Sequence, residues 1–157
     1  MALWAMWVRT SAEYIVIDLY HWVTYIPSLG GARLRVFKTK EFKRFARKES
    51  ISNDDLCTAI ERATRGIVDA SLGHGLIKQR IPRKGQGRSG GFRTIIAYQH
   101  GNRSFFVYGF AKNEMDNIAG DDLKDVASYA AALLALTDKL LTAALKARKI
   151  EEVMCDA

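Results

Sequence analysis

Three segments within residues 75–112 constrain the fold more than any other part of the chain, because each alternates apolar and polar side chains over a short length. They are residues 75–82 (GLIKQRIP), 92–99 (FRTIIAYQ) and 103–112 (RSFFVYGFAK). Period-two alternation bounded by Gly, Pro or Asn is typical of strands. The connection at residues 100–102 is short enough for a hairpin. The three segments therefore predict an antiparallel meander at the centre of the fold.

Helices are predicted on both sides of this meander. Residues 34–39 predict a strand, residues 40–49 a helix, and residues 53–66 a second helix that starts at N-cap signals. Residues 119–150 predict a long C-terminal helix, and residues 150–153 could form a short closing strand. This order predicts an α+β domain with a compact antiparallel sheet, two N-terminal helices and a C-terminal helix.

Residues 1–33 differ in composition from the rest of the chain. They contain all three Trp residues, and neither of their apolar runs reaches the ~20 residues that span a bilayer. A signal peptide is not favoured, because no basic segment leads to a small-residue cleavage site. We expect residues 1–33 to be an N-terminal extension outside the main fold and residues 34–157 to be the folded domain. An extra element that packs on this domain is the alternative.

Positive charge is concentrated in the predicted meander. The chain has a net charge of +7, and residues 75–112 hold eight Lys or Arg and no Asp or Glu. A solvated surface ordinarily mixes both signs, so this block favours a polyanionic partner. Because alternate side chains of a strand share a face, neighbouring strands would bring four basic residues to one concave face: Lys78, Arg80, Arg93 and Lys112.

The loop at residues 83–93 (RKGQGRSGGFR) combines four Gly with four basic side chains. A nucleotide-binding P-loop would lead into a helix, whereas this loop leads into a strand. Its backbone N–H groups and three basic side chains could still contact phosphates; the alternative is a solvated hairpin loop. These side chains are Arg83, Lys84 and Arg88.

Aromatic residues alternate with the basic ones and would allow stacking on bases, although they could equally be core residues of the sheet. The candidates are Tyr98, Tyr108 and Phe110, and alternation would put Phe106 on the same face as the last two. His74 and His100 could act as base and acid in RNA cleavage, but both lie in predicted turns. The basic block has no carboxylates that could bind a catalytic metal ion.

The two cysteines, Cys57 and Cys155, are too few for a disulfide framework or a structural zinc site. They are more typical of a protein from a reducing cytosol. We therefore expect a cytoplasmic protein without a membrane segment.

Three motifs carry a resemblance to a known family. They are DASLGHGLIKQRI, GQGRSGGFRT and YGFAKNEMDNI, in that order and spacing, and the tail LLALTDKLLTAALKARKIEEV extends the similarity. Over roughly residues 34–157 the chain resembles the RelE-type toxins of type II toxin–antitoxin systems, in the HigB-like branch. The resemblance implies a compact microbial ribonuclease-like fold. It also implies an endoribonuclease, a ribosome-dependent mRNA interferase that inhibits translation without a metal or other cofactor.

The resemblance also implies roles for single residues and for partners. Arg93 matches the family's phosphate-stabilising arginine, Lys78 and Arg80 match a basic pair that includes a candidate general base, and Lys112 matches a later basic residue. Asn113 stands where a second basic residue is common. Ile118 and Ala119 occupy the place of an aromatic, for which Tyr98, Tyr108 or Phe110 could substitute.

The implied partners are the ribosome, mRNA and an antitoxin of the helix-turn-helix DNA-binding class. Two other functions stay open: a non-catalytic nucleic-acid-binding module, and an inactive relative with the toxin fold.

Overall fold

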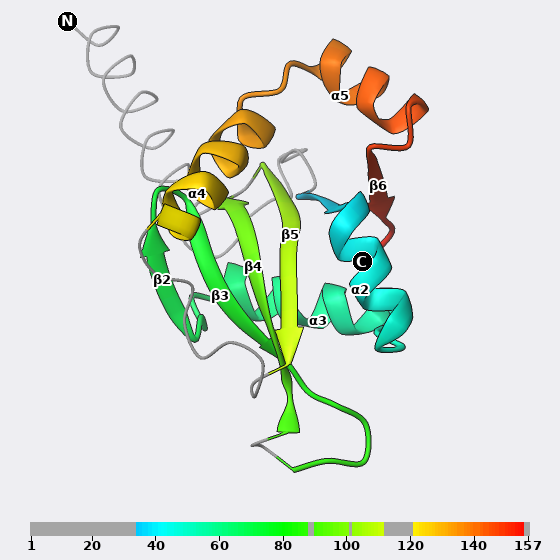
Figure 1. The fold of residues 1–157 in the computed structure, drawn as a ribbon, viewed down its shortest axis with the longest axis vertical. Helices are drawn as coiled ribbons and strands as arrows, with labels where there is room; N and C mark the ends of the chain where they lie inside the picture. The colour runs from blue at the N-terminus through cyan, green and yellow to red at the C-terminus, as the bar shows by residue number, and fades with distance from the viewer. Residues whose placement is uncertain (1–33, 88–89, 101, 112–120, 156–157) are drawn as a thin grey trace, which may run out of the picture. The chain divides into compact units, whose positions relative to one another are not determined.

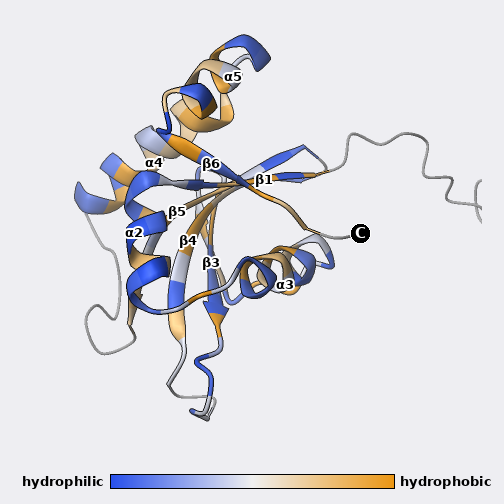
Figure 2. Ribbon diagram, turned by 90° about the vertical axis from the view of Figure 1, so that its right-hand side faces the viewer, coloured by the Kyte–Doolittle hydropathy of each residue, from blue (hydrophilic) through white to orange (hydrophobic). Residues whose placement is uncertain are grey.

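The computed structural model describes residues 34–87, 90–100, 102–111 and 121–155, which form one six-stranded mixed sheet with helices on both faces (Figure 1, Figure 2). The strands are β1 (Arg35–Thr39), β2 (Ala70–Gly73), β3 (Leu76–Ile81), β4 (Phe92–Gln99), β5 (Arg103–Ala111) and β6 (Ile150–Val153). The helices are α2 (Lys40–Lys48), α3 (Asn53–Thr64), α4 (Asp121–Leu134) and α5 (Asp138–Lys146).

The strands lie in the order β2-β3-β4-β5-β1-β6. Strands β3 to β5 form the predicted antiparallel meander, β2 extends it at the β3 edge, and β6 is the predicted closing strand. The α+β class and the two N-terminal helices are confirmed. The sheet is mixed rather than purely antiparallel, because β1 lies between β5 and β6 and runs parallel to β5. Four of the five β1 residues are buried, as expected for a strand with structure on both faces.

Each face of the sheet has its own apolar core. On one face, Phe42 of α2 and Leu56 and Ile60 of α3 pack with Ile96 and Phe106 of the sheet. On the other face, helices α4 and α5 cover the sheet through a second set of buried side chains, which includes Ala130, Leu133, Leu141, Ile95 and Phe105. The two faces are therefore stabilised independently, one by the N-terminal helices and one by the C-terminal helices.

Side-chain caps determine where the N-terminal helices begin. Thr39 Oγ1 accepts a hydrogen bond from Phe42 N at 3.2 Å, which starts α2 at the end of β1. Ser52 and Asp55 form a reciprocal capping box at the start of α3, as the sequence predicts. Such caps satisfy N–H groups that have no partner within the helix.

The prediction of one long C-terminal helix is wrong, because the chain breaks into α4 and α5 at a bend of 108°. Thr137 starts the second helix by accepting a hydrogen bond from Leu140 N at 3.3 Å. No helix in the described part of the chain is long and apolar enough by itself to span a membrane. Only α4 and α5 taken together, across their bend, meet that length and composition.

Two local features of the sheet were not predicted. Strand β2 is short and half-exposed, and its sequence gives little sign of a strand. In β5 the register shifts, so that Tyr108 pairs with Ile95 whereas Phe106 pairs with Ile96. This irregularity turns Phe106 to the α2/α3 face, and the prediction that it shares a face with Tyr108 is wrong. A β-bulge has this effect because one extra residue reverses the alternation.

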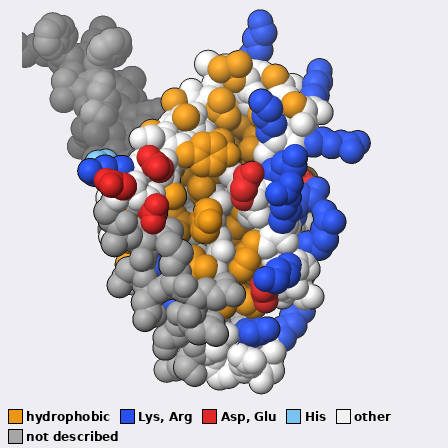
Figure 3. All heavy atoms as spheres, viewed as in Figure 1, with side chains coloured by type: hydrophobic (Ala, Val, Ile, Leu, Met, Phe, Trp, Pro, Cys, Tyr) orange, Lys and Arg blue, Asp and Glu red, His pale blue; other side chains and the backbone are white. Residues whose placement is uncertain are grey.

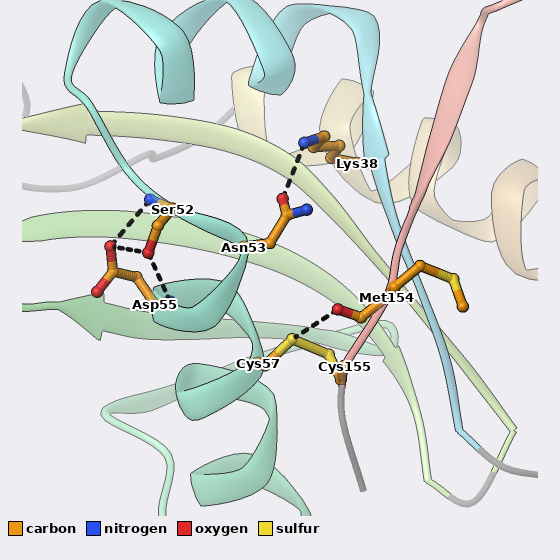
Figure 4. The surroundings of a disulfide bond; sticks show 7 residues. All are labelled: Lys38, Ser52, Asn53, Asp55, Cys57, Met154 and Cys155. Carbon is orange, nitrogen blue, oxygen red and sulfur yellow. Dashed lines mark hydrogen bonds between the residues drawn. A yellow bond between two sulfur atoms is a disulfide. The ribbon is translucent and has the colours of Figure 1, made fainter.

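A disulfide joins Cys57 in α3 to Cys155, which follows β6 (Figure 4). The Cα atoms are 5.5 Å apart, and the two residues are separated by 98 positions in the sequence. This one bridge links the C-terminal strand to the helix layer. The interpretation of the two cysteines as typical of a reducing cytosol is therefore wrong, because disulfides are rare in that compartment. The predicted extension at residues 1–33 lies outside the described residues, so the domain boundary stays a prediction.

Candidate functional site

Three predicted basic residues share one face of the sheet, at the end of the strands farther from the β4–β5 turn. Arg80 of β3 pairs directly with Arg93 of β4, and Lys78 pairs with Ile95 on the same face. Tyr108 of β5 pairs with Ile95 from the other side, and 46 % of its surface is exposed. We call this group of four side chains the basic sheet face: Lys78, Arg80, Arg93 and Tyr108.

The two arginines of the basic sheet face have unused hydrogen-bond donors. Like charges directly opposite each other destabilise a sheet pair, and Arg80 and Arg93 occupy such positions. Arg80 Nε and Arg93 Nη1 are buried, and neither has a hydrogen-bond partner among the described residues. A buried donor without a partner costs about 1–3 kcal/mol, and more when it is charged. An anion bound at this face would remove that cost.

The position of Arg80 is determined by its surroundings. Its backbone N–H donates to the Asp69 carboxylate, and its Nη2 donates to the carbonyl of Gly87 at 3.2 Å. At Gly91, an added Cβ would lie 2.6 Å from Arg80 Nε and 2.8 Å from the carbonyl oxygen of Ile81. Only glycine at this position allows the arginine to lie so close to the backbone.

Gln79 supports this arrangement from the opposite face, where it is completely buried. Its Nε2 donates to the carbonyls of Ala59 at 3.1 Å and Ile67 at 3.0 Å, and its Oε1 accepts from Asp69 N at 3.3 Å. The side chain thus ties the α3–β2 connection to β3. Sequence reasoning missed both Gln79 and Asp69, although a polar residue between Ile77 and Ile81 on an apolar face was a usable signal.

Two of the predicted aromatic residues are not exposed beside the basic residues. Phe110 pairs with Arg93 on the same face of the sheet, but it is only 4 % exposed and belongs to the core on the α4 side. Tyr98 packs against the core on the opposite face, where burial raises its pKa, and its hydroxyl lies 3.2 Å from His100 Nδ1. Only Tyr108 of the three is exposed beside the basic residues.

The predicted basic loop contributes less than its sequence indicates. Arg83 lies 5.3 Å over the Phe92 ring and 3.8 Å from a carboxylate oxygen of Glu49, which partly offsets its charge. Lys84 is exposed. Arg88 and Lys112 lie outside the described residues, so their place relative to the basic sheet face stays a prediction.

The two candidate histidines, His74 and His100, lie at the opposite end of the sheet from Arg80 and Arg93. His74 is in the β2–β3 turn and His100 follows β4. The histidine-based alternative therefore lacks a cluster with the basic residues. Among the described residues, no three His, Cys, Asp or Glu side chains lie together as metal ligands.

A second group of cations lies along α2, where Figure 3 shows Lys and Arg side chains gathered on one side of the molecule. Exposed members of this α2 group are Lys40, Arg44, Arg47 and Lys48. By contrast, cations of β1 are paired with acids of β6: Arg35 Nε lies 2.8 Å from Glu152, and Lys38 Nζ lies 2.9 Å from Glu151.

These ion pairs change the acidity of the β6 carboxyl groups. The hydrogen bond from Lys43 lowers the pKa of Glu151, and the hydrogen bond from Arg35 lowers the pKa of Glu152. The neighbouring β1 and β6 strands are therefore electrostatically matched, whereas the basic sheet face is not.

Within the part of the chain that the structure describes, this is a small α+β protein whose mixed sheet carries, at one end, two arginines with no acid paired to their side chains. The chain belongs to the RelE toxin family: residues 34–153 match the family described as the RelE toxin of the RelE / RelB toxin-antitoxin system. It is therefore the toxin of a toxin–antitoxin pair, with an antitoxin as its partner. No curated protein matches the chain with significant similarity.

Proposed function

We propose that this toxin is a ribosome-dependent mRNA interferase, an endoribonuclease that cleaves messages during translation and so inhibits protein synthesis. The observation that carries the proposal is the pair of buried, unpartnered guanidinium donors on Arg80 and Arg93. Two such donors on adjacent strands suit the oxygens of one phosphate, because guanidinium groups form strong charge-assisted hydrogen bonds to phosphate.

The proposed reaction is attack by the ribose 2′-oxygen on the adjacent phosphorus. A bond from O2′ to phosphorus forms, the bond from phosphorus to O5′ breaks, and the products are a 2′,3′-cyclic phosphate and a 5′-hydroxyl. Negative charge grows on the phosphoryl oxygens in the transition state, where preorganised donors stabilise it most. Arg80 and Arg93 are the proposed donors.

The reaction also needs a base for the 2′-hydroxyl proton and an acid for O5′. An arginine is not deprotonated in a protein, so Lys78 is the proposed base. The exposed hydroxyl of Tyr108 lies on the same face and is the proposed proton donor. Lys112 is retained as a fourth catalytic residue from the sequence prediction. No metal ion or other cofactor is part of this scheme.

The ribosome is proposed to orient the message. Holding the 2′-oxygen in line with the phosphorus replaces a large entropic cost of the uncatalysed reaction. Lys84, with Arg83 and Arg88, is proposed to contact RNA phosphates around the site. We further propose that the chain acts in the cytoplasm, belongs to the HigB-like branch, and is neutralised by a helix-turn-helix DNA-binding antitoxin.

The test is expression of the full chain without antitoxin, for the wild type and for Arg93→Ala. Loss of one preorganised donor typically lowers the rate by about 10²–10³, so the variant should relieve growth arrest and abolish primer-extension stops in translated messages. Arg65→Ala is the matched control, because Arg65 is the exposed residue that caps the C-terminus of α3 and is paired with Glu61 at 3.4 Å; this variant should stay toxic. Normal cleavage by Arg93→Ala would contradict the proposal. A uniform loss of ribosome binding in that variant, with no cleavage by the wild type, would instead support a binding module.

A further inference from the structure

A cavity of about 350 Å³ lies between the end of β3 and the segment that leads from α3 into β2. Its lining comes from α3, the α3–β2 connection, β3 and the following loop: Arg62, Asp69, Arg80, Pro82, Gln86 and Gly87. Arg80 also belongs to the basic sheet face, so the cavity adjoins the proposed phosphate site. Its volume is within the range of sites that bind small molecules.

The cavity combines a carboxylate with two guanidinium groups. Asp69 accepts the backbone N–H of Arg80 through one oxygen, and its other oxygen lies 4.0 Å from Arg62 Nη2. The Asp69 and Arg62 side chains keep 34 % and 32 % of their surface exposed. Each carboxylate oxygen has two lone pairs, so Asp69 can accept further hydrogen bonds from a ligand while it holds Arg80.

We propose that this cavity is a guanine-binding subsite, which takes the base of a nucleotide next to the phosphate held by Arg80 and Arg93. The inference rests on the proposed ribonuclease function and assigns a base preference to it. A nucleotide carries base and phosphate on one ribose, and Arg80 lines both places where they would bind. Two arginines and one aspartate give the cavity lining a net charge of +1, which also suits an anionic nucleotide.

Guanine fits this set of groups better than the other bases. Its Watson–Crick edge presents two adjacent donors, N1–H and N2–H, which match the two oxygens of a carboxylate. Its O6 and N7 are acceptors that suit arginine. Adenine and cytosine offer one amino donor on that edge, and uracil offers one N–H between two carbonyls. A carboxylate therefore gains a second hydrogen bond only from guanine.

The experiment measures binding of the four nucleoside 3′-monophosphates to the full-length protein by NMR titration, with inorganic phosphate as the probe of the phosphate site alone. None of these probes has a P–O5′ bond to cleave, so binding is read independently of catalysis. Guanosine 3′-monophosphate should bind roughly 5- to 100-fold more tightly than the other three, which is the discrimination expected of one bidentate base contact.

Variants separate the cavity from the phosphate site. Asp69→Asn keeps an oxygen for the Arg80 N–H but replaces the second acceptor with a donor, so it should abolish the preference for guanine and leave phosphate binding intact. Arg62→Ala removes a half-buried side chain and should weaken the same preference. Arg65→Ala, at the C-terminal cap of α3 three residues after Arg62, should change neither. Thermal unfolding of each variant checks that the fold survives.

Equal binding of all four nucleotides, binding of none, or a guanine preference that survives both Asp69→Asn and Arg62→Ala would overturn the inference. Cleavage of messages without base preference would also contradict the guanine subsite, while it would leave the interferase proposal intact. A guanine preference in a protein that cleaves no message would support the subsite and contradict the interferase.

Discussion

Removing the disulfide should take away a large part of the stability of the folded domain. Cys57 and Cys155 are 98 positions apart, so the bridge closes most of the described chain into one loop. In the chain-entropy treatment a loop of about 100 residues destabilises the unfolded state by about 4.7 kcal/mol. Domains of this size are stable by only about 5–15 kcal/mol. Reduction should therefore bring the protein close to the unfolding threshold.

The assay is urea unfolding of the full chain, with and without dithiothreitol, followed by circular dichroism. With a urea dependence of about 1–3 kcal/mol per molar, a loss near 4.7 kcal/mol lowers the midpoint by roughly 1.6–4.7 M. The double variant Cys57→Ser and Cys155→Ser is the control. Without reductant it should unfold like the reduced wild type, because both lack the bridge.

Two results would refute this reasoning. Coincident unfolding curves with and without reductant would mean that the bridge does not constrain the chain. A wild type that takes up two equivalents of a thiol-alkylating reagent without prior reduction would mean that the bridge is absent in solution. The second result is also informative about compartment, since a reducing cytosol keeps thiols reduced.

Three further predictions concern the supports of the site and the ion pairs. Gln79→Leu leaves the groups that Gln79 bonds without partners and should lower the urea-derived stability by at least about 2 kcal/mol. Gly91→Ala brings a Cβ against Arg80 Nε; primer extension should show at least about tenfold slower cleavage while the fold remains, with overpacking costing about 1–3 kcal/mol. The pKa of Glu152 lies below 4.5 because of Arg35, so its contribution to stability is complete above that pH and is lost as the pH falls through the lowered value. Glu152→Gln should reduce the drop in melting temperature between pH 7 and pH 3.

Alternation along the strands predicts the composition of the basic sheet face well. Lys78, Arg80 and Arg93 follow from period two once the strands are recognised, because β3 and β4 pair without any irregularity. Prediction fails in β5, where the register shift after Ile95 moves Phe106 to the other face. A bulge is determined by pairing with a neighbouring strand, which local sequence does not specify.

Long-range contacts explain the other failures. Alternation already places Tyr98 with Ile96 on the face opposite Arg93, where it packs against the α2/α3 core, so its choice as a stacking candidate beside Arg93 did not follow from the pattern. Alternation could not show that β1 inserts beside β5 in parallel. Helical periodicity continues through Thr137, so only its capping hydrogen bond to Leu140 N reveals the break between α4 and α5. The hydrogen-bond partners of Gln79 lie in α3 and the α3–β2 connection, so the sequence could mark Gln79 as an unusual polar residue on an apolar face without showing what it binds.

The distribution of ion pairs supports a functional origin for the charge on the basic sheet face. At β1 the chain places Glu151 and Glu152 opposite its cations, and these pairs lower the pKa of both carboxyl groups. Similar compensation would be simple to achieve beside Arg80 and Arg93, yet residues 75–112 contain no acid. The arginines are instead held by groups that leave donors unused: a carboxylate on the Arg80 backbone, a loop carbonyl and a glycine. The free-energy cost of these unpartnered donors disappears when a bound anion supplies the missing acceptors, which is the arrangement expected at a binding site.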